Sequence, residues 1–160
     1  MTPHTAGREM VVTRVINAPR ELVFAAFSDA EHFTLWWGPN GFRTTVYKMD
    51  VRPGGSSRYT MHGPDGKDWP NTIEYLEVVA PEKLVYRHGA EETLSNDPHC
   101  FHVTITFEAM QGKTLVTLRS LFPTVEQFEA AKQFGAVEGG QQTLGRLDAY
   151  LSGHPKLYLD

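Results

Sequence analysis

The segment spanning residues 124–151 constrains the fold most, because its apolar residues recur at helical spacing over the longest stretch of the chain. Thr124 is followed three residues later by Gln127, which is the pattern of a capping box at a helix N-terminus. Glycines interrupt this pattern, and each costs about 1 kcal/mol relative to alanine in a helix interior. We therefore predict one helix from Thr124 to about Gln133, a break at Gly135 and a second helix that ends at Leu151.

The glycines of this segment predict a helix face that another part of the structure approaches closely. Glycine lacks a Cβ atom, so it allows closer packing than any other residue. The approaching group is either a β-sheet or a ligand, and the sequence leaves both alternatives open. The glycines concerned are Gly135, Gly139, Gly140 and Gly145.

The residues before this segment predict an α+β fold in which an antiparallel sheet carries helices on one face. Alternating apolar residues and turn signals indicate seven strands, and two short helices are expected after the first strand. A polar loop at residues 89–98 is expected to be mobile. The expected strands are residues 9–17, 42–51, a strand containing Ser57, Tyr59 and Met61, and residues 69–79, 83–88, 100–109 and 114–121; the expected short helices are residues 19–28 and 29–35.

Composition places the 160-residue chain in the globular class, with 41% hydrophobic and 21% charged residues. We expect a flexible N-terminus at residues 1–8, one domain at residues 9–151 and a short tail at residues 152–160. The formal net charge of -4 argues against nucleic acid or an anionic membrane as the partner. The single cysteine, Cys100, excludes an internal disulfide and favours a cytoplasmic location. No apolar run is long enough to span a bilayer.

Several short motifs carry a resemblance to a known superfamily. The sequence Ala-Pro-Arg-Glu-Leu-Val-Phe at residues 18–24, after a first strand, resembles the opening of START-like (SRPBCC) proteins, which include the plant Bet v allergens and polyketide cyclases. Four further segments resemble the family named after the activator of the ninety-kilodalton heat-shock protein's ATPase, and the resemblance extends over residues 9–151. These segments are residues 36–39, 50–55, 63–66 and 135–151.

This resemblance implies a helix-grip (START-like) fold, in which a curved antiparallel β-sheet wraps around a long C-terminal α-helix and leaves a cavity between them. The family usually has a tryptophan where this chain has Gly140. An unfilled void there would be destabilising, so we favour a pocket that holds a ligand, with repacking as the alternative. Gly140→Trp is then expected to fill the cavity, stabilise the free protein and abolish ligand binding.

Strand alternation predicts which side chains face this cavity, because successive residues of a strand point to opposite faces of the sheet. His88 is the polar residue that ends an inward-facing apolar row. It either orients a ligand or moves a proton, or it lies half-exposed at a strand end and bonds to backbone. The residues expected to contact a ligand are Trp37, Tyr59, Met61, Tyr86, His88, Gly140 and Leu144.

Other candidate chemistry fails on spacing. His99 lies on the opposite strand face from Cys100 and His102, so these residues do not predict a metal site. Glu74 and Glu77 have opposite parity, and they are not expected to act as a carboxylate pair unless a bulge intervenes. No motif for a cofactor is present, and we expect none.

Three functions from different classes remain. The first is binding of a small, largely apolar or aromatic molecule in the cavity. The second is a cyclase- or lyase-type enzyme in which a cavity histidine or tyrosine carries a proton. The third is a co-chaperone that regulates a heat-shock ATPase, as the family name suggests; the eukaryotic activator has a further N-terminal domain not seen in this sequence. We rank binding first, and a homodimer remains open.

Overall fold

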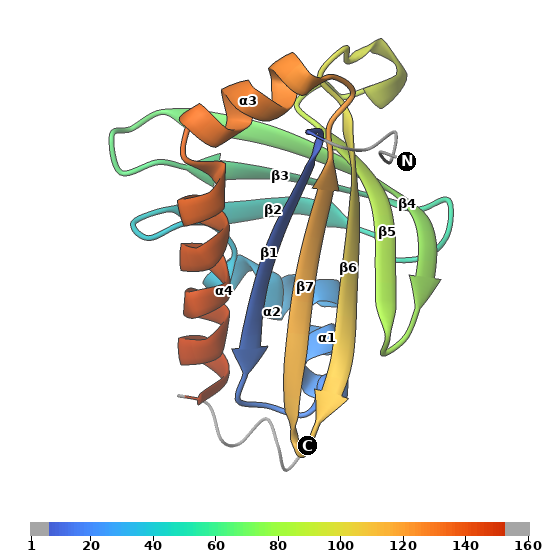
Figure 1. Ribbon diagram of the computed structural model, residues 1–160, viewed down its shortest axis with the longest axis vertical. Coiled ribbons are helices and arrows are strands. Elements are labelled where there is room, and N and C mark those ends of the chain that lie inside the picture. The colour runs from blue at the N-terminus through green and yellow to red at the C-terminus, as the bar shows by residue number, and fades with distance from the viewer. Residues whose placement is uncertain (1–6, 153–160) are drawn as a thin grey trace.

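The computed structural model describes residues 7–152, which form one curved sheet with helices on its concave side (Figure 1). Most of the expected flexible N-terminus and almost all of the expected tail lie outside the described residues. The elements are β1 (Glu9–Ile16), α1 (Arg20–Ser28), α2 (Ala30–Trp36), β2 (Arg43–Met49), β3 (Ser56–His62), β4 (Asp68–Val79), β5 (Lys83–Gly89), the short 3₁₀ helix η1 (Leu94–Asn96), β6 (Phe101–Met110), β7 (Lys113–Leu121), α3 (Val125–Gln133) and α4 (Ala136–Ser152).

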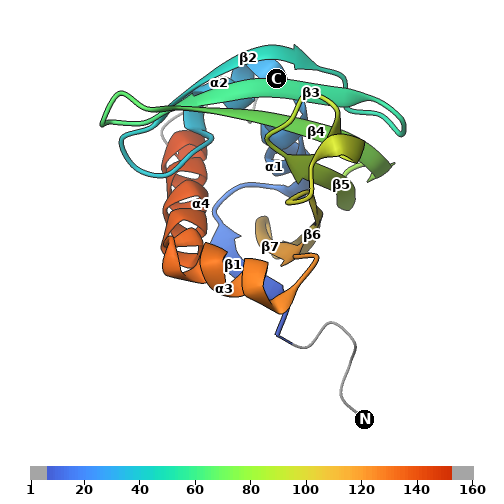
Figure 2. The same cartoon turned by 90° about the horizontal axis from the view of Figure 1, so that it is seen from above.

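The sheet has seven strands in the order β1-β7-β6-β5-β4-β3-β2, and all neighbouring strands are antiparallel. It curls so strongly that β2–β4 and the β1–β7–β6 group face each other across the interior. Seen from above, α4 lies along the open side between them and α3 crosses one end (Figure 2). This arrangement confirms the α+β class and the helix-grip fold.

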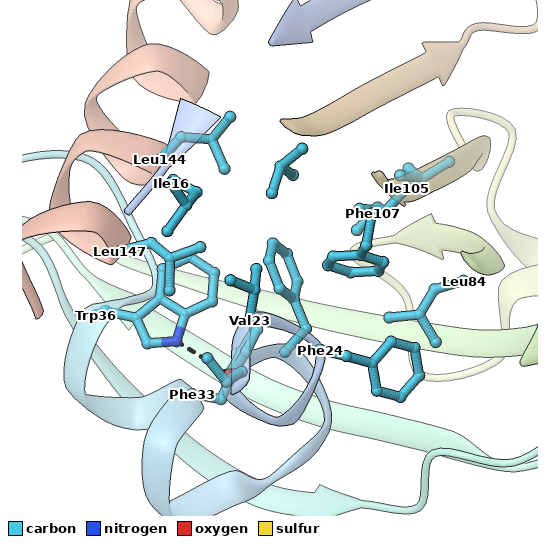
Figure 3. Close-up of a cluster of buried hydrophobic side chains, with 14 of the residues drawn as sticks. Ile16, Val23, Phe24, Phe33, Trp36, Leu84, Ile105, Phe107, Leu144 and Leu147 are labelled. Atoms are coloured by element: carbon cyan, nitrogen blue, oxygen red, sulfur yellow. Dashed lines mark hydrogen bonds between the residues drawn. The ribbon is translucent and has the colours of Figure 1, made fainter. Parts of the chain in front are cut away.

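The hydrophobic core occupies the part of the interior that α1 and α2 cover. Phe24 and Phe27 of α1 pack edge-to-face against Phe107 of β6, with ring centroids 5.3 and 5.2 Å apart. Trp36 is fully buried, and its indole N–H donates a 3.0 Å hydrogen bond to the Ala26 carbonyl, so its one polar group is satisfied (Figure 3). The C-terminal half of α4 completes this core with the fully buried side chains of Leu144, Leu147 and Leu151.

The junction between α3 and α4 forms where the sequence predicts it. The Thr124 hydroxyl accepts a 3.1 Å hydrogen bond from the Gln127 amide, as expected for a helix N-cap. The Gln127 side chain donates instead to the Pro98 carbonyl at 3.2 Å, which ties α3 to the loop before β6. Gly135 has a φ of 94°, a conformation that favours glycine, and the chain turns there from α3 into α4.

The sheet and the segment after α2 both approach the glycine face of α4 closely. A Cβ atom built on Gly140 would lie 3.1 Å from a methyl group of Val12 in β1. A Cβ atom on Gly139 would lie 3.5 Å from Pro39. The expectation that Gly140→Trp would fill the cavity and stabilise the protein stays a prediction, and it requires the Val12 side chain of β1 to move by a few tenths of an ångström.

The loop after β5 and strand β4 each bear on an expectation from the sequence. The loop after β5 is held in place, since Leu94 is buried and the Asp97 carboxylate accepts hydrogen bonds from the backbone amides of Ala90, Glu91 and His99. A bulge between Tyr75 and Glu77 shifts the register of β4. The bulge places Glu74 and Glu77 on the same outer face, where they pair with Arg87 and Lys83 at 3.0 and 2.8 Å.

Candidate functional site

A cavity of about 620 Å³ lies between the N-terminal half of α4 and strands β3, β5 and β7. It is distinct from the core, which uses the C-terminal half of the same helix. Phe134 is 76% exposed and Glu138 and Gln142 are also exposed, so these three lining residues mark the opening to solvent. The full lining consists of Trp37, Pro39, Phe42, Met61, His88, Leu118, Phe134, Gly135, Ala136, Glu138, Gly139, Gly140, Gln142 and Thr143.

His88 is the polar side chain that strand β5 contributes to the cavity wall. Its Nε2 atom lies 2.7 Å from Oδ1 of Asn71. The Asn71 amide nitrogen donates to the Trp69 carbonyl at 2.9 Å, which fixes the amide with its oxygen toward His88. His88 Nε2 is therefore the protonated nitrogen that donates, and Nδ1 carries the lone pair.

Burial is the main influence on the pKa of His88 and therefore on its protonation state. Desolvation lowers the pKa of His88 from its ordinary 6.5 to about 4, although the nearby Asp97 carboxylate acts in the opposite direction. The ring is therefore neutral at neutral pH. In that state it is a poor proton donor, and its low basicity also makes it a weak general base.

Aromatic residues with polar atoms lie around His88. The Tyr59 hydroxyl lies 3.5 Å from His88 Nε2, and Tyr59 is 1% exposed. Burial, followed by the neighbouring Tyr86 and Tyr75, raises the pKa of Tyr59 well above its ordinary value. The Trp37 indole packs edge-to-face on Tyr59, and its N–H is buried without a hydrogen bond of ordinary geometry. These tyrosines stay neutral and pack in the core behind the cavity wall.

The structure brings four of the seven sequence-predicted site residues to the cavity surface. Trp37, Met61, His88 and Gly140 line it, and Gly140 does so at the position where α4 packs on β1. The other three lie deeper: Tyr59, Tyr86 and Leu144 are almost completely buried in the core behind the wall. Their contact with a ligand stays a prediction.

Sequence reasoning missed most of the opening. Phe134, Ala136 and Glu138 fall at the α3–α4 junction, whose helical pattern indicated packing and gave no sign of a cavity mouth. Pro39 and Phe42 come from the segment between α2 and β2, where the sequence predicts a turn and then a strand that begins at Phe42. Asn71 carried a usable signal, because it shares strand parity with Ile73 and Tyr75 and is thus a polar residue on an inward row.

A second set of hydrogen-bonded polar side chains lies away from the cavity. His62 Nδ1 is 2.8 Å from Asp68 Oδ1, and His62 Nε2 is 2.8 Å from the Thr45 hydroxyl. These residues belong to three neighbouring strands, and both Thr45 and Asp68 are exposed. They line none of the cavities described, so we interpret this set as a cross-strand hydrogen-bond network.

Within residues 7–152, no three His, Cys, Asp or Glu side chains are grouped so that they could hold a metal ion. The same part of the chain has no helix with the length and apolar character needed to cross a membrane.

A curled antiparallel sheet that grips a C-terminal helix, with a cavity between them, defines a START-like protein of the helix-grip class. More particularly, the chain belongs to the family described as Activator of Hsp90 ATPase homolog 1-like protein, whose sequence profile matches residues 17–152.

Solved structures share this fold. A protein from Arthrobacter aurescens superimposes with a TM-score of 0.85 at 24% identity, over 95% of this chain and 90% of that one. A protein from Staphylococcus epidermidis gives a TM-score of 0.81 at 31% identity, over 96% and 94% of the two chains. The AHSA1 protein from Silicibacter pomeroyi gives 0.71 at 20% identity, over 90% and 97%. Among curated proteins, no sequence match was found.

Proposed function

We propose that this protein binds a small, largely apolar or aromatic molecule in the cavity between the sheet and α4. The observation that carries the proposal is the cavity itself, whose volume of about 620 Å³ lies within the range of small-molecule sites. Its inner wall is built from aromatic and aliphatic side chains with one neutral imidazole. Proteins of this fold commonly bind hydrophobic ligands, which is consistent with the proposal.

The state of His88 favours binding over acid–base catalysis. A catalytic acid or base works best when its pKa lies near the working pH, whereas burial lowers the pKa of His88 to about 4. Its Nε2–H is already donated to Asn71. The ring can therefore accept one hydrogen bond at Nδ1 and orient a ligand.

Ligand binding can be tested by native mass spectrometry of the purified protein, followed by a thermal-shift screen of small aromatic and lipid-like compounds. A ligand present at about 100 times its Kd stabilises the folded state by about 2.7 kcal/mol. For a domain of this size that free energy corresponds to a Tm increase of several degrees, at roughly 2–4 °C per kcal/mol.

Leu118→Trp locates the binding site, because Leu118 lines the cavity from β7 and an indole there would occupy its volume. The matched control is Thr117→Trp, which places the same side chain on the opposite face of the same strand. We expect Leu118→Trp to abolish the thermal shift and Thr117→Trp to retain it, with folding of both checked by circular dichroism. Equal shifts in the two variants would remove the cavity assignment.

A further inference from the structure

The charge in the cavity lining is of one sign, which is negative. Glu138 is exposed at the opening and lines the cavity. Among residues 7–152, neither lysine nor arginine contributes to the lining. A ligand that enters the cavity therefore meets a largely apolar surface, a few uncharged polar groups and one negative charge.

Neighbouring groups do not reverse this balance. Asp97 is the charged group that acts on His88, and it is negative. Arg146 lies nearby on α4, but its Nη1 atom donates to the carbonyls of Gly38 and Pro39 at 2.8 and 2.9 Å. The Arg146 side chain contributes, together with Arg14, to a second groove, which shares Gln142 with the cavity.

We propose that this cavity selects neutral molecules and rejects carboxylates, sulfonates and phosphates of the same skeleton. The inference rests on the proposed binding function and names the class of ligand. An anion buried in apolar surroundings without a cation is strongly disfavoured, and Glu138 adds repulsion at the opening. His88 does not supply the missing charge, because its ring is neutral at neutral pH. The wall instead offers polar contact of the kind that an uncharged hydroxyl or carbonyl group can satisfy.

Two fluorescent dyes with one aromatic skeleton test the proposal. N-phenyl-1-naphthylamine is neutral, and 8-anilinonaphthalene-1-sulfonate carries an added sulfonate. The full chain is titrated with each dye at pH 7 and low salt. We expect the Kd for the neutral dye to be at least about tenfold lower than the Kd for the sulfonate. Leu118→Trp should remove the binding of the neutral dye, whereas Thr117→Trp should leave it unchanged.

A charge reversal at the opening separates electrostatic selection from simple hydrophobicity. Glu138→Lys is expected to raise the affinity for the sulfonate severalfold and to narrow the difference in Kd between the two dyes. Glu126→Lys on α3 makes the same change in net charge at a residue that does not line the cavity. It should change neither affinity.

The possible failures are distinguishable. Equal affinity for both dyes, with both lost in Leu118→Trp, would overturn the charge selection and leave cavity binding intact. The same effect of Glu138→Lys and Glu126→Lys on the sulfonate would also overturn it, since the opening would then play no special part. If neither dye binds the unaltered chain, cavity binding of aromatic molecules fails and the charge selection fails with it.

Discussion

At the scale of single residues, the environment of His88 decides its chemistry. An exposed histidine titrates near pH 6.5, but this ring lies in the cavity wall with its Nε2–H donated to Asn71. Desolvation of the charged form outweighs the attraction of Asp97, so the pKa falls to about 4. His88 is thus a fixed polar contact in an apolar wall.

This shift makes protein stability depend on pH in a defined window. Between pH 6.5 and 4 the unfolded state binds a proton at His88 that the folded state does not, so stability falls as the pH is lowered. The expected loss between pH 7 and pH 4.5 is about 2 kcal/mol from this residue. Urea unfolding at the two pH values measures the free energy of unfolding. This free energy should fall less between pH 7 and pH 4.5 in His88→Gln than in the unaltered chain.

The exposed His102 provides the matched control. His102→Gln should keep the pH dependence of the unaltered chain. An unchanged pH dependence in His88→Gln would mean that His88 titrates normally in the folded protein.

The position of His88, but not its bonding, could be predicted from the sequence. Strand parity placed it at the end of an inward row, and the structure has it there. Its partner Asn71 comes from the neighbouring strand, and that pairing depends on the register of β4 against β5. Parity alone does not give a register, and for the same reason it did not show the bulge that brings Glu74 and Glu77 to one face.

At the scale of elements, the glycines of α4 differ in their surroundings. Gly140 faces Val12 of β1, where an added Cβ atom would lie at 3.1 Å and the valine would have to move. Gly145 faces the end of the Arg14 side chain at 3.6 Å, which is ordinary contact with a flexible group. The same substitution at these two positions should therefore have different effects.

We expect Gly145→Ala to stabilise the protein by about 0.5–1 kcal/mol, because alanine favours the helix and finds room there. In Gly140→Ala this gain is offset by crowding against β1, and overpacking typically costs about 1–3 kcal/mol. Chemical unfolding of the two variants gives the comparison. If Gly140→Ala were at least as stabilising as Gly145→Ala, the close packing of α4 on β1 would be contradicted.

Helix boundaries in this region were predictable because their signals are local. Thr124 caps α3 and Gly135 breaks the helix by its own conformation, so neighbouring residues contain the information. The group packed against Gly140 was not predictable in the same way. Val12 lies more than a hundred residues away, and only the closed sheet brings it to the helix.

At the scale of the whole molecule, the interior is divided along α4. The C-terminal half of α4 completes a packed core with α1 and α2, whereas its N-terminal half borders the cavity. Alternation and resemblance predicted the sheet, the helix and the existence of an inward face. They did not separate core from cavity, because Tyr86 and Leu144 have the same apolar pattern as Met61 and Leu118. That separation runs along the strands, because β3 and β5 each contribute one residue to the cavity lining and another to the buried core.

The central claim is that a ligand occupies this cavity, and nuclear Overhauser contacts to methionine methyl groups test it most directly. The full chain, labelled at its methionine methyl groups, is mixed with N-phenyl-1-naphthylamine. We expect contacts from the dye protons to Met61, which lines the cavity. We expect none to Met110, which is 43% exposed on β6 and lines no part of it. Contacts to Met110 with none to Met61 would contradict the account and place the ligand on the outer surface.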